Sequence, residues 1–238
     1  VCYQEEVRDP SRIAEVLNRV IEKARRGSAP AQINVPRDYW TQVIDIELPQ
    51  VIKIERSPGG ADAIANAAQL LSDAKFPVIL NGAGVVLSGG IPASAQLAER
   101  LDAPVCCNYQ HNDAFPGSHP LAAGPLGYNG SKAAMELISK ADVVLALGTR
   151  LNPFSTLPGY GIDYWPNDAK LIQVDINADR IGLTKNVDVA IQGDARKVAE
   201  QILEQLSSSA GDQNRDARKA EIEKCKSAWT HELSQMDH

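Results

Sequence analysis

The chain has 238 residues, more than a typical single domain of about 100–150, so one complete core with partial neighbours is expected. Hydrophobic residues make up 44% and charged residues 23%, which is typical of a globular protein and excludes a chain built of membrane spans. The 24 basic and 30 acidic residues leave a net charge of −6, and no basic stripe with interleaved aromatics stands out. Neither a nucleic-acid partner nor a membrane partner is therefore expected.

The cysteine pattern bears on redox chemistry and on metal binding. Cys2, Cys106, Cys107 and Cys225 include no CxxC pair. This spacing fits neither a disulfide framework nor a zinc site, so no metal-binding residue is predicted. The thiols are expected to be buried and reduced, which favours a cytoplasmic location.

The first predicted elements are a helix and a short strand. Asp9 and Pro10 form a good helix start, and apolar residues recur at helical spacing until Gly27. A strand is expected at 31–35, although one strand cannot form a sheet by itself. The stretch 36–58 carries three prolines and no clean period, which predicts an extended connector.

The centre of the chain alternates strands with helices. Four short apolar runs rich in β-branched residues predict strands at 77–80, 104–107, 143–147 and 171–174. Helical spacing predicts helices at 61–74, 91–101, 131–140 and 195–206. This alternation predicts an α/β fold, a three-layer parallel sheet with helices on both faces. Such a sheet has a ligand crevice at the carboxyl ends of its strands.

The C-terminal segment begins with a serine-rich stretch. Residues 207–211 are expected to form a flexible break. Beyond it, apolar residues recur at steps of three and four, namely Ile222, Cys225, Trp229, Leu233 and Met236. This apolar stripe needs a covering surface, either the core of this chain or a domain outside it.

The turn after the first central strand carries half of a dinucleotide fingerprint. The string NGAG at 81–84 has two glycines, which let the backbone turn tightly and approach a bound group, but Leu87 stands in place of the third glycine. After the next strand, CCN at 106–108 stands where a ribose-binding acidic residue is wanted. These residues argue against an ordinary dinucleotide dehydrogenase.

Several segments together carry a family resemblance. They are FPVILNGAGVV, the stretch from LAERLDAPVCC to ALGTRL, AKLIQVDINADRIG and IQGDA. They resemble the central domain of thiamine-diphosphate-dependent enzymes of the acetolactate synthase and pyruvate oxidase type. The most specific parts are the HP-x3-G-x2-G-x2-G loop from His119 to Gly130 and the strand ADVVLALGTR. The resemblance covers residues 10–206 and implies a Rossmann-like central domain with partial flanking elements.

The resemblance also implies a division into domains. The string APAQINVPRDYW looks like the last strand and exit of the pyrimidine-binding domain, so residues 1–48 would be the C-terminal piece of that domain. Residues 49–57 would be a linker and 58–206 the central domain, while 207–238 would be a linker and the first helix leading to the diphosphate-binding domain. The implied partners are the missing pyrimidine- and diphosphate-binding domains and further copies of the chain, because the family assembles its active sites between subunits.

The chemistry implied by the resemblance belongs to thiamine diphosphate, held with magnesium in the parent. The glutamate that activates the coenzyme and the GDG motif that holds magnesium belong to the two other domains. Here GDA at 193–195 lacks the second glycine, and Asp194 is predicted to cap a helix. The chain would be a central-domain fragment, inactive alone, with no catalytic residue and no bound cofactor. The overall likeness implies that the parent converts sulfoacetaldehyde and phosphate to acetyl phosphate and sulfite, in sulfonate metabolism.

Flavin-bearing relatives suggest a candidate nucleotide crevice. The matching positions are Gly82, Ala83, Gly84, Arg150, Asp175 and Asn177. In that role Arg150 would pair with a phosphate and Asp175 would accept from ribose hydroxyls. The segment LNPF after Arg150 replaces the acidic pair and second arginine of acetolactate synthases, which argues against flavin.

Alternative functions follow from the same residues. The first is an acetolactate-synthase-like enzyme or a flavin- or ADP-binding module of a 2-oxo acid enzyme. The second alternative is a stand-alone NAD-dependent dehydrogenase or deacylase, which is supported by fold analogy alone.

The long connections of this region carry histidines and aromatic residues. His111 and His119 would either transfer protons or act as hydrogen-bonded turn elements. The Pro- and Gly-rich stretch 153–166 carries four aromatic residues and predicts an ordered loop that covers the sheet or forms an interface.

Overall fold

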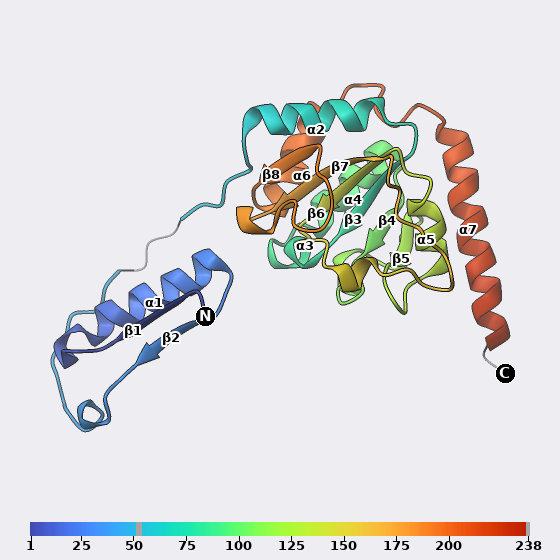
Figure 1. The fold of residues 1–238 in the computed structure, drawn as a ribbon. Coiled ribbons are helices and arrows are strands. Elements are labelled where there is room, and N and C mark those ends of the chain that lie inside the picture. Colours follow the sequence, from blue (N-terminus) through green and yellow to red (C-terminus); the bar gives the residue numbers. More distant parts are fainter. Residues whose placement is uncertain (51–53, 237–238) are drawn as a thin grey trace. The chain divides into compact units, whose positions relative to one another are not determined.

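The computed structural model describes residues 1–50 and 54–236 (Figure 1). The chain divides into two compact units, Val1–Glu55 and Arg56–His238, and each has its own hydrophobic core. No helix within the described ranges is long and apolar enough to cross a membrane.

The first unit combines two strands with one helix. Strand β1 (Tyr3–Glu6) lies parallel to β2 (Ala31–Asn34), and the two are joined through the turn η1 (Pro10–Arg12) and helix α1 (Ile13–Gly27). A second short turn, η2 (Arg37–Tyr39), follows β2. The sequence pattern predicts a lone strand here, and the structure corrects this by adding β1, whose sequence YQEE has no apolar run.

The second unit is built on a six-stranded sheet in the order β5-β4-β3-β6-β7-β8. The strands are β3 (Pro77–Asn81), β4 (Val105–Cys107), β5 (Ala122–Pro125), β6 (Val143–Leu147), β7 (Lys170–Asp175) and β8 (Val189–Gln192). All neighbouring strands are parallel, so the predicted parallel α/β fold is confirmed. The four predicted strands are the inner ones, whereas β5 and β8 are edge strands without a continuous apolar run.

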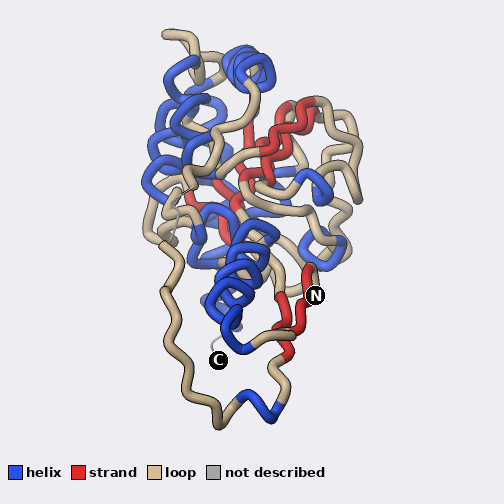
Figure 2. The backbone as a smooth tube through the Cα atoms, turned by 90° about the vertical axis from the view of Figure 1, so that its left-hand side faces the viewer, coloured by secondary structure: helices blue, strands red, loops and turns tan. Residues whose placement is uncertain are grey.

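Helices lie around this sheet, whose strands occupy the interior of the unit (Figure 2). Helices α2 (Ala61–Asp73), α4 (Ile91–Leu101) and α6 (Ala195–Gln205) form one packed group, and α5 (Lys132–Ile138) with α7 (Arg215–Met236) forms another. A short helix, α3 (Ala83–Leu87), follows β3 directly. At the start of α6, the Asp194 carboxylate accepts from the N–H groups of Arg196 and Lys197, which confirms the predicted cap.

Two arginines hold the segment between α6 and α7. The guanidinium of Arg100 donates to the carbonyl oxygens of Ser207, Ser208 and Ala210. Arg218, which is 1% exposed, donates to five further carbonyls around the same segment. The expectation of a flexible break at 207–211 is therefore wrong, because tertiary hydrogen bonds fix this serine-rich stretch.

The apolar stripe of α7 is covered by its own unit. Ile222 and Cys225 are buried, and Trp229 packs against the same core. The Trp229 ring also lies against Tyr160, with 5.8 Å between centroids. Of the two alternatives for this stripe, the structure shows the chain folding back on itself. Leu233 and Met236, at the far end of α7, stay exposed.

Candidate functional site: the carboxyl edge of the sheet

The candidate residues lie at the point where the strand order reverses. The chain runs outward from β3 to β5 on one side and from β6 to β8 on the other, so the switch point lies between β3 and β6. Gly82, Ala83 and Gly84 follow β3, Arg150 follows β6, and Asp175 and Asn177 lie at the end of β7. The structure thus brings the predicted residues to one edge of the sheet.

The two glycines of the turn after β3 are required by the chain itself. Their N–H groups donate to backbone carbonyls, Gly82 to Leu147 at 3.0 Å and Gly84 to Gly148 at 2.9 Å. A Cβ added to Gly82 would lie 2.6 Å from the Gly148 oxygen, and one added to Gly84 would lie 2.6 Å from the Gly148 Cα. The close approach predicted at these glycines is made to the turn after β6. Both amides are therefore already used.

Asn108, which follows β4, links the neighbouring turns. Its Nδ2 donates to Thr149 Oγ1 at 2.7 Å, and this oxygen also accepts from the Leu151 N–H at 3.1 Å. The Asn108 Oδ1 atom is buried and has no hydrogen-bond partner in the structure. An orphaned buried acceptor is costly, by about 1–3 kcal/mol, unless a water or a ligand donor satisfies it.

The acidic residue of this edge is Asp175. Its carboxylate is 6% exposed and accepts from the Asn177 N–H at 2.9 Å. Burial raises the pKa of Asp175, while that hydrogen bond and the charges of Arg180 and Arg150 act in the opposite direction. Asn177 in turn caps the turn η5 (Ala178–Arg180) through its side-chain oxygen. Asp175 and Asn177 therefore both stabilise this loop, whereas Arg150 is exposed.

Two buried amide side chains near the site were not predicted from the sequence. Gln173 is 1% exposed and ties three loop segments together: Nε2 donates to the Thr149 and Arg180 carbonyls, and Oε1 accepts from Gly182 N–H. Asn81 is fully buried and bonds Ser94 and the Ala114 carbonyl. The available signal was a polar residue inside or at the end of an apolar strand, since such a group needs buried partners.

The two histidines differ in their surroundings. His119 Nδ1 accepts from the Leu121 N–H at 3.2 Å, so Nε2 carries the hydrogen and donates to Glu99 at 3.1 Å. Its ring also meets Phe115 edge-on at 5.0 Å. His119 is therefore a hydrogen-bonded turn element. His111 Nδ1 lies 3.7 Å from the Asp113 carboxylate, an arrangement that leaves both predicted roles open.

The cysteines offer no activated thiol in the sheet. Cys106, Cys107 and Cys225 are buried and Cys2 is exposed, so the expected burial holds for three of the four. Burial raises the pKa of Cys106 and raises that of Cys107 to about 12. Both remain protonated at neutral pH and act as small core residues.

The described residues fit thiamine diphosphate with magnesium poorly. No group of three or more His, Cys, Asp or Glu within the described ranges could hold a metal ion. The amides of Gly82 and Gly84, the natural donors for a diphosphate, are bonded to the turn after β6. A nucleotide fits the edge in part, because Asn108 Oδ1 could accept from a hydroxyl and Arg150 is exposed.

Comparison with known proteins identifies relatives along the whole chain. The family described as thiamine pyrophosphate enzyme, central domain, matches residues 64–202. Sulfoacetaldehyde acetyltransferase of Roseovarius nubinhibens is 76% identical over 238 residues, which are 100% of this chain and 40% of that protein. The protein of the same name in Rhodobacter capsulatus is 68% identical with the same coverage. A probable acetolactate synthase large subunit of Methanocaldococcus jannaschii is 34% identical over 84% of this chain and 35% of its own.

Solved structures agree on the fold. Benzoylformate decarboxylase from Polynucleobacter necessarius matches with a TM-score of 0.75 and 21% identity, over 90% of this chain and 40% of that one. A putative thiamin diphosphate-dependent enzyme from Mycobacterium smegmatis gives a TM-score of 0.69 and 23% identity, over 87% and 40%. The chain thus spans about 40% of the length of the acetyltransferases and of these solved chains.

Proposed function

The chain belongs to the thiamine pyrophosphate enzymes, whose central domain it carries, and on this premise we propose that it is the scaffold domain of a sulfoacetaldehyde acetyltransferase. The observation that carries the proposal is the identity of 68–76% to relatives of that name along the full chain. The acetolactate synthase relative, at 34%, is more distant. In the proposed reaction the carbon–sulfur bond of sulfoacetaldehyde breaks and sulfite leaves. The former aldehyde carbon loses its hydrogen as a proton and becomes an acetyl carbonyl bonded to a phosphate oxygen, while the carbon that carried the sulfur gains a proton and becomes the methyl group.

The residues of this chain would position the flanking domains and would not take part in the reaction themselves. Thiamine diphosphate would supply the carbon nucleophile and the electron sink from outside the chain, held there with magnesium. The fixed turns after β3 and β6 and the Gln173 hydrogen bonds give a rigid sheet edge on which flanking domains could be held. We expect the 238-residue chain to be inactive alone. A homo-oligomeric parent in the cytoplasm is part of the proposal, supported by the family resemblance and by the buried free thiols.

Calorimetric titration tests whether this chain binds the coenzyme without the other domains. The 238-residue chain is titrated with thiamine diphosphate plus magnesium, and no saturable heat is expected because the described residues include no ligand set for either. A stoichiometric micromolar signal would contradict the proposal.

A domain exchange tests the acetyltransferase assignment itself. The matching 40% of the Roseovarius nubinhibens enzyme is replaced by this chain, and sulfite release from sulfoacetaldehyde and phosphate is measured. We expect the chimera to release sulfite, because the two segments are 76% identical. The control is the same exchange with the segment from the acetolactate synthase relative. A folded chimera of this chain that binds the coenzyme but releases no sulfite would refute the assignment.

Nucleotide binding at the sheet edge is a second candidate function. It is favoured by the unsatisfied Asn108 Oδ1 and by the exposed Arg150, and it is weakened by the engaged glycine amides. A rise in melting temperature with ADP or FAD would support it, because a ligand that binds the native state stabilises it. Loss of that rise in Arg150→Gln would locate the site, and no rise at millimolar ligand would eliminate this function.

A further inference from the structure

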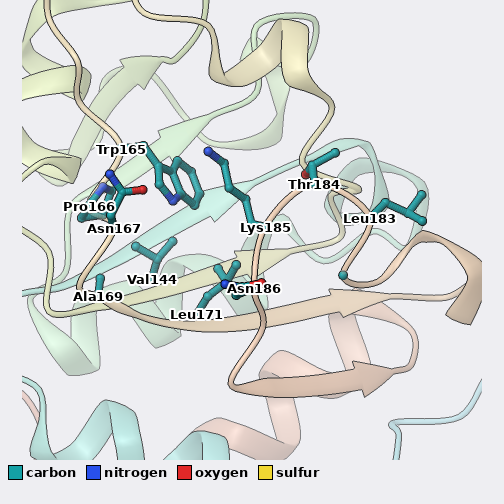
Figure 3. Close-up of a pocket in the computed structure, with 11 residues that line it drawn as sticks. Val144, Trp165, Pro166, Asn167, Ala169, Leu171, Leu183, Thr184, Lys185 and Asn186 are labelled. Carbon is teal, nitrogen blue, oxygen red and sulfur yellow. The ribbon is translucent and has the colours of Figure 1, made fainter.

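A hollow of about 460 Å³ lies over the amino-terminal halves of β6 and β7, in the size range of small-molecule sites (Figure 3). Val144 and Leu171 are register partners on these strands, so their side chains point to the same face and form the floor. Trp165 and Lys185 rise from two facing loops and point toward one another above that floor.

The hollow exists because two connections lack covering helices. The β6–β7 connection contains the short turn η4 (Pro153–Thr156), and the β7–β8 connection contains η5. Both connections are fully described, and neither includes an α-helix. The loops 165–169 and 182–186 therefore form the walls and leave the space between them open.

Apart from Thr184, whose hydroxyl donates to the Leu151 carbonyl at 2.8 Å, the side-chain donors of the walls have no protein acceptor among the described residues. Lys185 Nζ lies 4.7 Å from the centroid of the Trp165 ring. Across the described ranges, no carboxylate pairs with Lys185, and the Asn167 and Asn186 amides and the Trp165 indole N–H make no hydrogen bond to protein. None of the 11 lining residues is acidic, although the chain as a whole carries a net charge of −6. Asp168 is a sequence neighbour of the wall and does not line the hollow.

We propose that this hollow binds a small organic anion with a flat body and one oxyanion group, which is a carboxylate, a sulfonate or a phosphate. A lysine side chain with two amides is a suitable donor set for such a group, and charge-assisted hydrogen bonds are the strong ones. The apolar floor and the part of the Trp165 ring that Lys185 leaves uncovered would contact the flat body. The hollow lies on a face of the sheet, separate from the Gly82–Gly84 edge. The inference is therefore independent of the proposed function.

The test follows the indole N–H signals of the ¹⁵N-labelled 238-residue chain by NMR. The chain has 3 tryptophans, and the signal that disappears in Trp165→Phe belongs to Trp165. Phenyl phosphate, benzenesulfonate and benzoate are titrated separately to compare the oxyanions on one ring. Each is expected to shift the Trp165 signal with a Kd of about 0.1–1 mM, as suits ligands of this size, and the dianionic phosphate should bind most tightly. Neutral benzamide and inorganic phosphate alone should shift it at least ~10-fold less.

Matched variants locate the charge that is recognised. Lys185→Ala should weaken phenyl phosphate binding ~10-fold or more, while Lys185→Arg should stay within ~3-fold of the original chain. Arg196→Gln, a change on the exposed surface of α6, should leave the affinity unaltered. Three results would overturn the proposal. The Trp165 signal would not shift at ligand concentrations 10-fold above the expected Kd, benzamide or inorganic phosphate would shift it as much as the organic anions, or Lys185→Ala would bind phenyl phosphate with full affinity.

Discussion

The two units of the chain are stabilised by different kinds of interaction. In Arg56–His238, every residue of β3 and β6 is buried, and helices lie around the sheet. In Val1–Glu55, the core is Val7, Val16 and Val20, while Leu17 and Ile21 of α1 are 43% and 46% exposed. A unit with so small a core buries little surface and is marginally stable by itself, whereas a large core tolerates buried polar groups that are fully bonded. We therefore expect buried hydrogen bonds and packing to contribute most to the stability of the larger unit, and surface ion pairs to be more important in the smaller one.

The largest expected effect is at the buried Arg218 of the larger unit. Its guanidinium bonds the carbonyls of Lys75, Leu101, Asp102, Gly211 and Gln213. Arg218→Met leaves these acceptors without their donor, and the hydrogen bonds to Leu101 and Gly211 are fully buried. We expect the free energy of unfolding to fall by about 4 kcal/mol, measured by urea denaturation, since each orphaned group costs about 1–3 kcal/mol. Hydrogen exchange at 207–214 should also become faster.

Arg196 provides the matched control on a solvent-exposed face. It pairs with Glu200 one helical turn away on α6, at 2.8 Å. Arg196→Met should leave the urea midpoint almost unchanged, because exposed pairs contribute little. If the two arginine variants lost similar stability, the contrast between buried and exposed interactions would be wrong.

A somewhat smaller effect is expected where the turns after β3 and β6 touch. Gly148 has a φ of 63°, and a Cβ there would lie 2.7 Å from the Gly84 Cα. Gly148→Ala should cost about 3 kcal/mol, from left-handed backbone strain plus overpacking. Gly89 has nearly the same φ, 66°, with nothing within 4 Å of its Cβ position, so Gly89→Ala should cost about 1 kcal/mol. Thermal denaturation of both variants measures the difference, and equal losses would show that close approach is unimportant.

The smallest effect concerns surface ion pairs of the first unit. Hydrogen bonds from Arg12 and Arg19 lower the pKa of Glu15 from the usual 4.5 to about 2. Because the folded pKa is depressed, this stabilisation is present above about pH 4.5 and is lost as the pH falls toward 2. NMR titration of the Glu15 carboxyl should give a midpoint near 2, which Arg12→Gln should raise. Arg25→Gln, which removes the pair with Glu22, should not. A Glu15 midpoint near 4.5 in the original chain would contradict the network.

Sequence patterns predicted the inner strands because burial on both faces produces continuous apolar runs, and the longer helices because their apolar residues recur at helical spacing. The short helix α3 lies in a stretch that the sequence analysis took as a turn. The edge strands β5 and β8, and β1 in the first unit, lack such runs, since one side or face of each is exposed. Local rules also placed Asp194 at a helix start, because its carboxylate bonds the N–H groups of neighbouring residues.

The candidate site was predictable only in position. Residues after parallel strands must gather at one edge, so Gly82–Gly84, Arg150 and Asp175 could be grouped from the sequence. The hydrogen-bond partners of those residues could not be predicted, because the partners are distant in the sequence. The Gly84 amide bonds the Gly148 carbonyl, and Gln173 bonds the Thr149 carbonyl.

The sequence by itself determined the parallel α/β sheet, its inner strands and the family, because these follow from periodic burial and from short motifs. Tertiary structure alone decided that the glycine turn is filled by the turn after β6, that Arg100 and Arg218 hold the serine-rich stretch, and that Trp165 and Lys185 face each other across a hollow. The physical reason is that close backbone approach, buried hydrogen bonds and cavities depend on residues distant in sequence meeting in space, which no local pattern encodes.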